Sequence, residues 1–495
     1  MYSSMVDIVK HTFQNTLQTK FYFKSGQIEV IDHPVEFYKT LKNKIAQSKD
    51  KIFMASLYLG KSEEEIIHCI SKALQKNDEL KVYFMVDGLR GTRESPSKCS
   101  ASLLAQLVRD YGDRVDVRTY KTPAIFGLKE SLVPKRFNEG FGLQHMKIYG
   151  FDDEVILSGA NLSRDYFTNR QDRYYLFKLK PFADYYFNLH QMISKLSFKV
   201  LYSTNAQKYV LVWPDNNLAS DPRRNKTKFL EQTSKLLQTF FKTPFGNNTT
   251  TNTLKVGEQQ GTLYPTVVYP VSQFTPLFSA SIGDQSTEKP SILKLLTSTL
   301  QNRDEQQLKQ KSWVFTAGYF NMLPEIKHKL LSSKSAKGTV ITASPHANGF
   351  FESKGVSKYL PDAYTYLSYK FLKEVSKKGY ENSICLREWK RGVVNQPSGW
   401  SYHAKGIWIT EPGEKEPCIT VVGSSNYTKR AYKFDLESNC IIATTDKDLK
   451  KQMQAEIDNI MQYTSPVTLN TFKTVPERKV SNGVKIATAL LSDKL

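Results

Sequence analysis

The chain of 495 residues contains no apolar run that approaches the roughly 18 residues of a membrane-spanning helix. Its 5 cysteines show no CxxC spacing, which argues against a disulfide framework and a zinc site and is typical of a reducing compartment. The opening stretch, MYSSMVDIVKHTFQNTLQTKFYFK, has no arginine and a single aspartate, so it matches neither a secretory signal nor a typical transit peptide. If the protein is imported into an organelle, we expect its targeting segment to be atypical here or already absent.

Acidic residues are also in deficit, because 48 Asp and Glu face 69 Lys and Arg, which gives a formal net charge of +21. This surplus says nothing about the fold, but it favours anionic partners: nucleic acid, phosphorylated substrates or an acidic membrane surface. Apolar residues make up 40% of the chain, enough for globular cores, and the length allows two or three domains.

A His-x-Lys pattern occurs twice, in QHMKIYG and in YHAKGIW. Each copy continues with an apolar strand, a small-residue turn that ends in Asn (SGAN or GSSN), and a carboxylate 11 residues beyond that Asn. The residues are His145, Lys147, Asn161 and Asp172 in the first copy and His403, Lys405, Asn426 and Glu437 in the second. The distance from His to Asn is 16 residues in one copy and 23 in the other, and the difference equals the length of EPGEKEP, 411–417, which predicts a longer hairpin tip.

The similarity extends upstream of both histidines. A strand, helix and strand pattern starts at KIFMASLYLG in the first copy and at SWVFTAGYFN in the second, 94 and 91 residues before the respective histidine. Alternating strands and helices predict an α/β fold with mostly parallel central sheets covered by helices. We therefore expect two similar α/β domains, 1–215 and 263–495, related by a pseudo-twofold axis and joined by a linker or surface segment, 216–262.

His and Lys two residues apart on a strand project from one face about 7 Å apart, so both can reach one phosphate group. Two such pairs across a pseudo-twofold axis predict a basic pocket with a histidine on each side. One neutral imidazole can attack phosphorus while the other transfers a proton. The lysines and Asn amides would hold the phosphate oxygens, and Asp172 and Glu437 would fix the imidazole tautomers. We expect this chemistry to need no metal and no other cofactor.

This arrangement resembles the phospholipase D superfamily, whose repeat is HxKxxxxD followed by GSxN. The first copy has Asp152 at the matching distance, but Thr410 stands there in the second, so we assign Asp152 a supporting role. The second copy has the full GSxN, with Ser424 and Ser425, where the first has SGAN. The resemblance implies that both serines bind substrate.

Several stretches resemble the eukaryotic phosphatidylglycerophosphate synthases of this superfamily, and the fungal members above all, over about residues 20–490. They are ASLYLGKSE, DGLRGTRE, VPKRFNEGFGLQHMKIYGFD, SGANLSRDYFTNRQDRYYLF, REWKRGVVN and GWSYHAKGIW. The second stretch contains Arg90 and Arg93, which the resemblance implies as substrate-binding residues.

The resemblance implies transfer of a phosphatidyl group from CDP-diacylglycerol to glycerol 3-phosphate with release of CMP, the committed step toward cardiolipin. It implies a peripheral protein on the matrix side of the mitochondrial inner membrane, bound to an anionic lipid surface and without nucleic acid as a partner. By analogy with the superfamily, His145 is the expected nucleophile that forms a phosphatidyl-histidine, and His403 the acid and base. The near-symmetric sequence leaves the reverse order open.

The basic surplus also fits a phosphodiesterase of the same superfamily that acts on nucleic acid or phospholipid. Against nucleic acid, no stretch interleaves aromatic residues with Lys and Arg in a stacking pattern. A non-catalytic lipid-binding scaffold would predict decay of one motif, and apart from Thr410 neither has decayed. ASLYLGKS, 55–62, matches a relaxed phosphate-loop pattern but lacks the glycines that such a loop needs, and His346 is a secondary candidate for the pocket rim.

The first copy carries extra residues between the strand VDVRTY and His145. This segment, 121–144, combines Ile125, Phe126 and other large apolar side chains with three cations. The apolar set either packs into the core or forms a rim that dips into a bilayer, where the diacyl tails of a substrate would remain.

Overall fold

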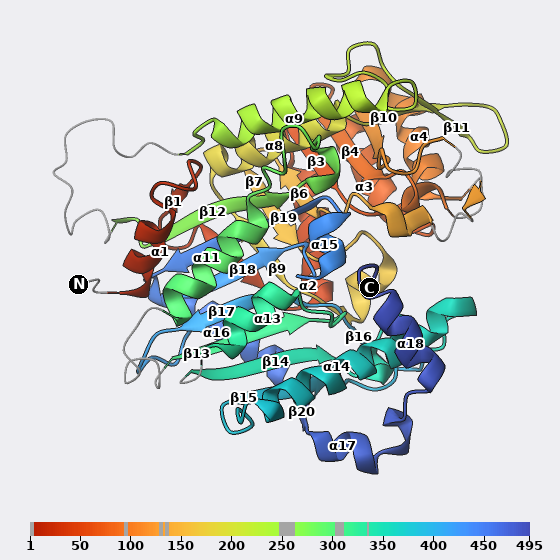
Figure 1. The fold of residues 1–495 in the computed structure, drawn as a ribbon. Helices are drawn as coiled ribbons and strands as arrows, with labels where there is room; N and C mark the ends of the chain where they lie inside the picture. Colours follow the sequence, from red (N-terminus) through yellow and green to blue (C-terminus); the bar gives the residue numbers. More distant parts are fainter. Residues whose placement is uncertain are drawn as a thin grey trace.

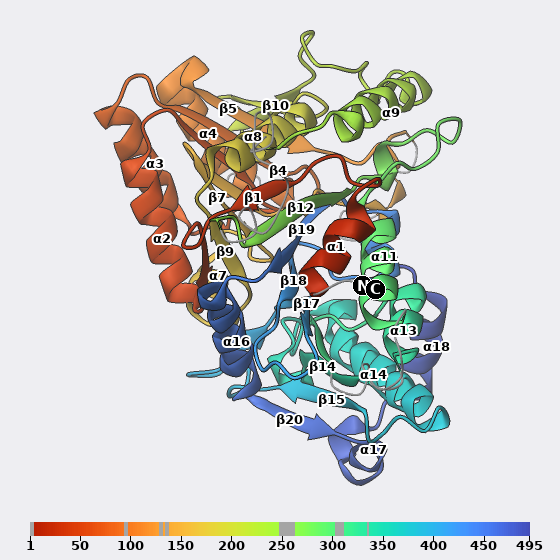
Figure 2. The same cartoon turned by 90° about the vertical axis from the view of Figure 1, so that its left-hand side faces the viewer.

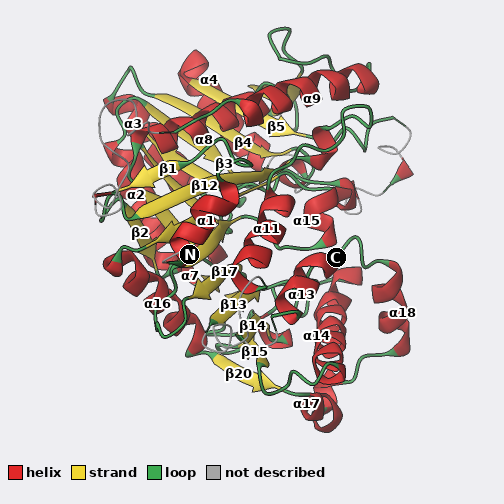
Figure 3. Ribbon diagram, turned by 60° about the vertical axis from the view of Figure 1, so that its left-hand side comes forward, coloured by secondary structure: helices red, strands yellow, loops and turns green. Residues whose placement is uncertain are grey.

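The computed structural model describes residues 4–93, 98–127, 132–133, 138–246, 263–301, 311–333 and 336–495. These residues form two nine-stranded sheets with helices packed around them (Figure 1). A short two-stranded sheet joins a segment of the first His-x-Lys copy to a segment of the second. Figure 3 shows the strands running through the middle of the molecule and most of the helices on the outside.

The first sheet contains the strands of the first His-x-Lys copy. In spatial order the strands are β11 (Tyr209–Val212), β10 (Phe198–Tyr202), β5 (Val115–Tyr120), β4 (Lys81–Asp87), β3 (Lys51–Ala55), β6 (Ile148–Phe151), β7 (Glu154–Ser158), β9 (Tyr174–Phe177) and β2 (Ile28–Ile31). The three strands β3, β4 and β5 are parallel, and every other neighbouring pair in this sheet is antiparallel.

The second sheet repeats this order. Its strands are β1 (Phe21–Phe23), β12 (Thr266–Gln273), β19 (Glu437–Thr444), β18 (Ile419–Gly423), β17 (Lys405–Thr410), β13 (Ser312–Ala317), β14 (Lys337–Ala343), β15 (Ile384–Trp389) and β20 (Thr464–Val467). Here β13, β14 and β15 are parallel and correspond to β3, β4 and β5, while β17, β18 and β19 correspond to β6, β7 and β9.

The α/β class is confirmed, but the expectation of mostly parallel sheets is wrong. Both sheets are mixed, and in each only two of the neighbouring pairs within the described residues are parallel. The sequence reasoning extended the pattern of the crossover helices, which does produce parallel strands, to the whole domain. The His-x-Lys strand is instead followed by a hairpin, β6–β7 or β17–β18, and a hairpin can only join antiparallel strands.

Three hydrophobic cores hold these layers together. The outer core of the first sheet packs under α2 (Pro34–Gln47), α3 (Glu64–Lys76) and α4 (Ser100–Tyr111), and Figure 2 shows α2 and α3 side by side. The outer core of the second sheet packs under α1 (Met5–Phe13), α11 (Glu288–Leu300), α13 (Pro324–Leu331) and α14 (Leu360–Lys377). The third core lies between the sheets and includes side chains of α8 (Lys180–Ser194) and α16 (Lys447–Met461). Because both faces of each sheet are buried, their central strands are apolar on both sides.

The predicted division into 1–215, 216–262 and 263–495 stays a prediction, to which the structure adds two facts. The helix α1 and the strand β1 pack on the second sheet, where β1 pairs with β12. Within the predicted linker, Lys226–Lys242 form the helix α9, whose Phe229 and Leu237 are buried in the core between the sheets. Residues 247–262 lie outside the described residues.

Arg173 anchors the first half of the chain in the second. Its side chain is fully buried, and its guanidinium forms an ion pair with Glu456 of α16, with an Nε–Oε1 distance of 2.7 Å. It also donates to the carbonyl oxygens of Lys405 and Val421 and to the hydroxyl of Thr420, all in or beside β17 and β18. The planar guanidinium is therefore saturated by partners from the opposite half, which compensates for its burial.

Replacing Arg173 with Met should destabilise the protein strongly, because Glu456 would keep its charge in the interior without a counter-ion. We expect the free energy of unfolding to fall by about 3–5 kcal/mol, measured by urea denaturation followed by tryptophan fluorescence. As a control, Lys178→Met removes the exposed pair of Lys178 with Glu29 and should cost less than about 1 kcal/mol. Equal losses in the two variants would contradict the role of Arg173 as an anchor.

Candidate active site

His145 is positioned by a short parallel ladder between the two halves of the chain. Its backbone N–H donates to the carbonyl oxygen of Leu436 at 2.9 Å, and the N–H of Leu436 donates to the carbonyl oxygen of Leu143 at 2.8 Å. The segment that leads into β6 is thus paired with the residue immediately before Glu437. This pairing sets His145 beside the carboxylate of the second half.

His403 is held in the equivalent way by the two-stranded sheet. The strand β16 (Ser401–Tyr402) runs parallel to β8 (Arg170–Gln171), and the N–H of His403 donates to the carbonyl oxygen of Gln171 at 2.8 Å. Because β8 ends immediately before Asp172, the ladder sets His403 beside the carboxylate of the first half.

The two imidazoles are therefore paired crosswise. Nδ1 of His145 lies 2.8 Å from Oε1 of Glu437, and Nδ1 of His403 lies 2.7 Å from Oδ2 of Asp172. Both carboxylates are buried; Glu437 also accepts from the Ser424 hydroxyl, and Asp172 accepts from the backbone N–H of Arg173 at 2.8 Å. A carboxylate at Nδ1 favours the tautomer that carries its proton there, which leaves Nε2 with a lone pair.

Burial keeps the imidazoles uncharged. It lowers the pKa of His145 and that of His403 well below the usual value, and Lys147 and Lys405 act in the same direction. Burial also raises the pKa of Glu437 to about 7, an effect that the positive charge of Lys147 partly offsets. Neutral imidazoles suit nucleophilic attack and proton abstraction, because both need the free lone pair of Nε2.

The two motif lysines lie behind the imidazoles. Nζ of Lys147 donates to the carbonyl oxygen of His145 at 2.6 Å, and Nζ of Lys405 lies 2.8 Å from Nδ1 of His403 and 3.9 Å from Oδ2 of Asp172. Burial lowers the pKa of both ammonium groups. Neither lysine lines the cavity described next, so in this conformation they support the histidines rather than form its wall.

A cavity of about 420 Å³ opens between the two halves in front of both imidazoles. Six of the residues singled out from the sequence line it, and they come from both copies of the repeat. They are His145, His403, Asn161, Asn426, Arg90 and Arg93. The two copies therefore form one shared site, as the pseudo-twofold hypothesis requires.

The two asparagines differ in their contacts. Asn161 accepts from the backbone N–H of Leu57 at 3.3 Å and donates to the hydroxyl of Tyr166 at 3.1 Å. The amide oxygen of Asn426 is buried, and the described residues supply no partner for it. Asn426 is thus a polar group on the cavity wall with unused hydrogen-bonding capacity.

Three predicted residues lie away from the cavity lining. Ser424 donates to Glu437, and the hydroxyl oxygen of Ser425 accepts from the N–H of Tyr427 at 3.2 Å, so neither serine reaches the cavity. Asp152 occupies the β6–β7 turn in a left-handed conformation, with φ of 50°. Its carboxylate accepts from the backbone N–H groups of residues 49–51 at 2.8 to 3.0 Å, which fastens the turn to the start of β3.

Cationic side chains lie on both sides of the cavity. On the His403 side, Arg170 pairs with Asp165 at 2.8 Å and donates to the hydroxyl of Ser401 at 2.8 Å. On the His145 side, three cations gather around the backbone of residues 139–140, through an ion pair or a hydrogen bond to it. They are Arg93, Arg430 and Lys494. An elongated dianionic substrate could contact both groups at once.

Sequence reasoning missed several residues of the cavity wall. They are Arg170, Arg430, Lys494, Tyr166, Tyr319 and Tyr364. Arg170 and Arg430 both lie between the motif Asn and the carboxylate of their copy, but 9 and 4 residues after the Asn, so the repeat spacing gave no signal for them. The tyrosines have no equivalents at matching spacing either, because packing of the two halves brings them together.

The proposed membrane rim is wrong for its first residue. Ile125 is fully buried, and Phe126 is half-buried with its ring packed edge-on against Phe198. Of the remaining segment, 128–131 and 134–137 lie outside the described residues. His346 does not line the cavity and packs against Phe351. In the phosphate-loop-like stretch 55–62, only Leu57 and Tyr58 reach the cavity.

Comparison with known proteins decides the family. The chain is 55% identical over 500 residues to the CDP-diacylglycerol–glycerol-3-phosphate 3-phosphatidyltransferase of Saccharomyces cerevisiae, covering 100% of this chain and 93% of that protein. The chain belongs to this phosphatidyltransferase family. The Schizosaccharomyces pombe member is 40% identical over 96% of each chain, and the human member, named mitochondrial, is 32% identical over 98% of this chain and 86% of its own. No protein-family model matches.

The fold of this phosphatidyltransferase is similar to that of a solved enzyme of another specificity. The crystal structure of phosphatidylserine synthase from Haemophilus influenzae matches with a TM-score of 0.68 and 21% sequence identity, over 98% of this chain and 100% of that one. Among the described residues, no helix is both long and apolar enough to cross a bilayer. The same residues include no group of three or more His, Cys, Asp or Glu side chains placed to hold a metal ion.

The geometry predicts that both cavity histidines are neutral, with the proton on Nδ1, at pH 6, because burial lowers their pKa values. This is measurable by ¹⁵N NMR of protein labelled at histidine, which separates imidazolium from the two neutral tautomers. Spectra of His145→Ala and His403→Ala identify the two signals. An imidazolium signal from either residue at pH 6 would contradict the proposed electrostatics.

Proposed function

We propose that this chain transfers a phosphatidyl group from CDP-diacylglycerol to glycerol 3-phosphate, with release of CMP, through a phosphatidyl-histidine intermediate. The observation that carries the proposal is the pair of buried imidazoles, each held at Nδ1 by a carboxylate of the other half and both facing one cavity. Membership of the phosphatidyltransferase family supports the same overall reaction.

In the first step, Nε2 of His145 attacks the phosphorus of the phosphatidyl group. The bond between this phosphorus and the bridging oxygen of CMP breaks, and CMP leaves as an anion. Glu437 stabilises the positive charge that develops on the imidazole, because its carboxylate accepts the Nδ1 proton. A phosphate leaving group needs little help from a proton, which agrees with a neutral His403 at this stage.

In the second step, Nε2 of His403 removes the proton from a hydroxyl of glycerol 3-phosphate. The freed oxygen attacks the phosphorus, the phosphorus–nitrogen bond breaks, and His145 is restored. Asp172 holds His403 in the tautomer that this base needs. We retain His145 as nucleophile and His403 as base from the superfamily analogy, since the two imidazoles have equivalent surroundings.

The remaining polar residues would bind the phosphates. Asn161, Asn426, Arg90 and Arg93 line the cavity and are candidates to hold the phosphoryl oxygens. Lys147 and Lys405 would gain positive charge when a phosphate enters, because a nearby anion favours the ammonium form. We assign Ser424 to orienting Glu437, and Asp152 to fastening a turn. Nothing in this scheme requires a metal or another cofactor.

The cellular setting remains a proposal as well. We propose a peripheral location on the matrix side of the mitochondrial inner membrane, on an anionic lipid surface. The net charge of +21 supports attraction to such a surface, and the chicken and human relatives carry the word mitochondrial in their names. Family membership also favours the lipid reaction over the phosphodiesterase alternative.

Removing either imidazole should abolish transfer. We expect His145→Ala and His403→Ala each to lower kcat by several orders of magnitude, because nucleophile and base act as a unit. The measurement is formation of phosphatidylglycerophosphate from labelled CDP-diacylglycerol. His403→Ala should in addition accumulate labelled, acid-labile protein when glycerol 3-phosphate is omitted, whereas His145→Ala should not. If both variants keep a tenth of the wild-type turnover, the two-histidine mechanism fails.

The pH dependence of transfer should report Glu437. Below a pH of about 7 this carboxylate takes up a proton and no longer stabilises the charge on His145, so kcat/KM should fall with decreasing pH. In Glu437→Gln the acid limb should disappear, with a rate at pH 8 about 10²–10⁴-fold below that of the wild type. Glu29→Gln, on the surface, is the matched control and should keep the wild-type profile. An unchanged acid limb in Glu437→Gln would contradict the assignment.

A further inference from the structure

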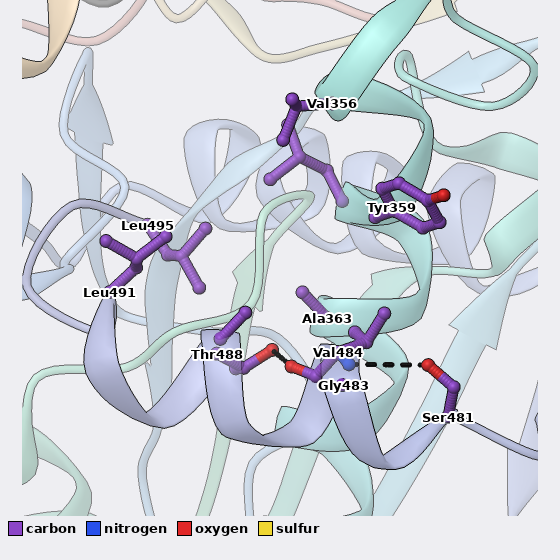
Figure 4. Close-up of a pocket in the computed structure, with 11 residues that line it drawn as sticks. Val356, Tyr359, Ala363, Ser481, Gly483, Val484, Thr488, Leu491 and Leu495 are labelled. Carbon is purple, nitrogen blue, oxygen red and sulfur yellow. Dashed lines mark hydrogen bonds between the residues drawn. The ribbon is translucent and has the colours of Figure 1, made fainter.

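A second cavity, of about 390 Å³, lies beside the active-site cavity and differs from it in chemistry (Figure 4). Its walls come from the 3-10 helix η6 (Gly355–Tyr359), from the start of α14 and from α18 (Asn482–Leu490). Figure 4 shows the side chains of Val356, Ala363, Val484 and Leu491 around this groove. Its lining is almost entirely apolar, whereas arginines, carboxylates and tyrosines line the active-site cavity.

The groove and the active-site cavity are continuous. Leu360 and Leu495 line both of them. Their neighbours Tyr364, one turn further along α14, and Lys494 line the active-site cavity. A ligand whose charged part lies against His145 and His403 can therefore extend an apolar part into the groove past these two leucines.

The mouth of the groove lies in the most apolar part of the described surface. Ten large apolar side chains are exposed among the described residues, and half of them are found here. They are Val356, Tyr359, Ile486, Leu490 and Leu491, with exposed fractions of 47% to 79%. Lys354 and Lys358 are exposed on the adjacent turn. Clustered exposed apolar side chains fringed by cations are typical of a surface that contacts anionic lipid.

We propose that this groove holds an acyl chain of the bound CDP-diacylglycerol, which enters it from a lipid surface in contact with α18. The proposal rests on the phosphatidyl transfer proposed above, because that substrate combines a charged headgroup with apolar chains. The adjoining polar and apolar cavities match these two parts. Burial in the groove also removes chain methylenes from water, so longer chains bind more tightly.

The test compares two substrates in detergent mixed micelles: CDP-diacylglycerol with two oleoyl chains and the same headgroup with two butanoyl chains. The readout is the ratio of kcat/KM for the long-chain substrate to that for the short-chain one. Ala487→Trp fills the groove from α18, and Leu491→Asp places a charge in it; both positions are exposed enough to accept the change. Ala489→Trp is the matched control, since Ala489 is exposed on the same helix and is not part of the lining.

We expect the ratio to fall about tenfold or more in Ala487→Trp and in Leu491→Asp, and to stay at the wild-type value in Ala489→Trp. An unchanged ratio in both groove variants would overturn the proposal. An equal fall in Ala489→Trp would also overturn it, because the helix would then act only by general contact with the lipid surface. If the wild type forms no phosphatidylglycerophosphate from either substrate, the proposed function itself fails and the groove proposal with it.

Discussion

Each imidazole of the cavity is held by a carboxylate from the opposite half of the chain, and this exchange joins the two sheets into one site. The pairing depends on two short parallel ladders, residues 143–145 with Leu436 and residues 401–403 with 169–171. Arg173, next to Asp172, extends the same crossing into a buried ion pair with Glu456. Neither half alone contains a complete pair of histidine and carboxylate, so the chemistry requires the native packing of both.

The site concentrates charge in an interior where charge is costly. Two lysines, two carboxylates and two histidines are buried within a few residues of one another, and burial shifts the pKa of each toward its neutral form. A negatively charged phosphate would reverse part of this, because it favours protonation of the lysines. The arrangement is therefore tuned for a bound anion, and the packed core between the sheets keeps it in place without that anion.

The cavity and the groove together describe an amphipathic ligand. Polar residues from both repeats surround the histidines, while the groove is built from elements of the second half alone, η6, α14 and α18. The pseudo-symmetry of the two sheets thus ends where the apolar groove begins. A duplicated fold can supply two equivalent halves of a phosphoryl-transfer site, but a substrate with a headgroup at one end and chains at the other needs an asymmetric surface.

The sequence by itself determined the duplication, the α/β class, the family and the four residue types of each repeat, because these are local patterns of spacing and periodicity. It did not determine the strand directions beyond the crossover helices, the burial of Ile125, or the position of Lys147 and Lys405 behind the imidazoles. Nor could it identify Arg170, Arg430 and the tyrosines of the cavity. Only the tertiary structure decided that Asp172 serves His403 and Glu437 serves His145. The physical reason is that such pairings depend on which strands become neighbours when the apolar faces of both sheets are buried together, and no spacing along one chain encodes that contact.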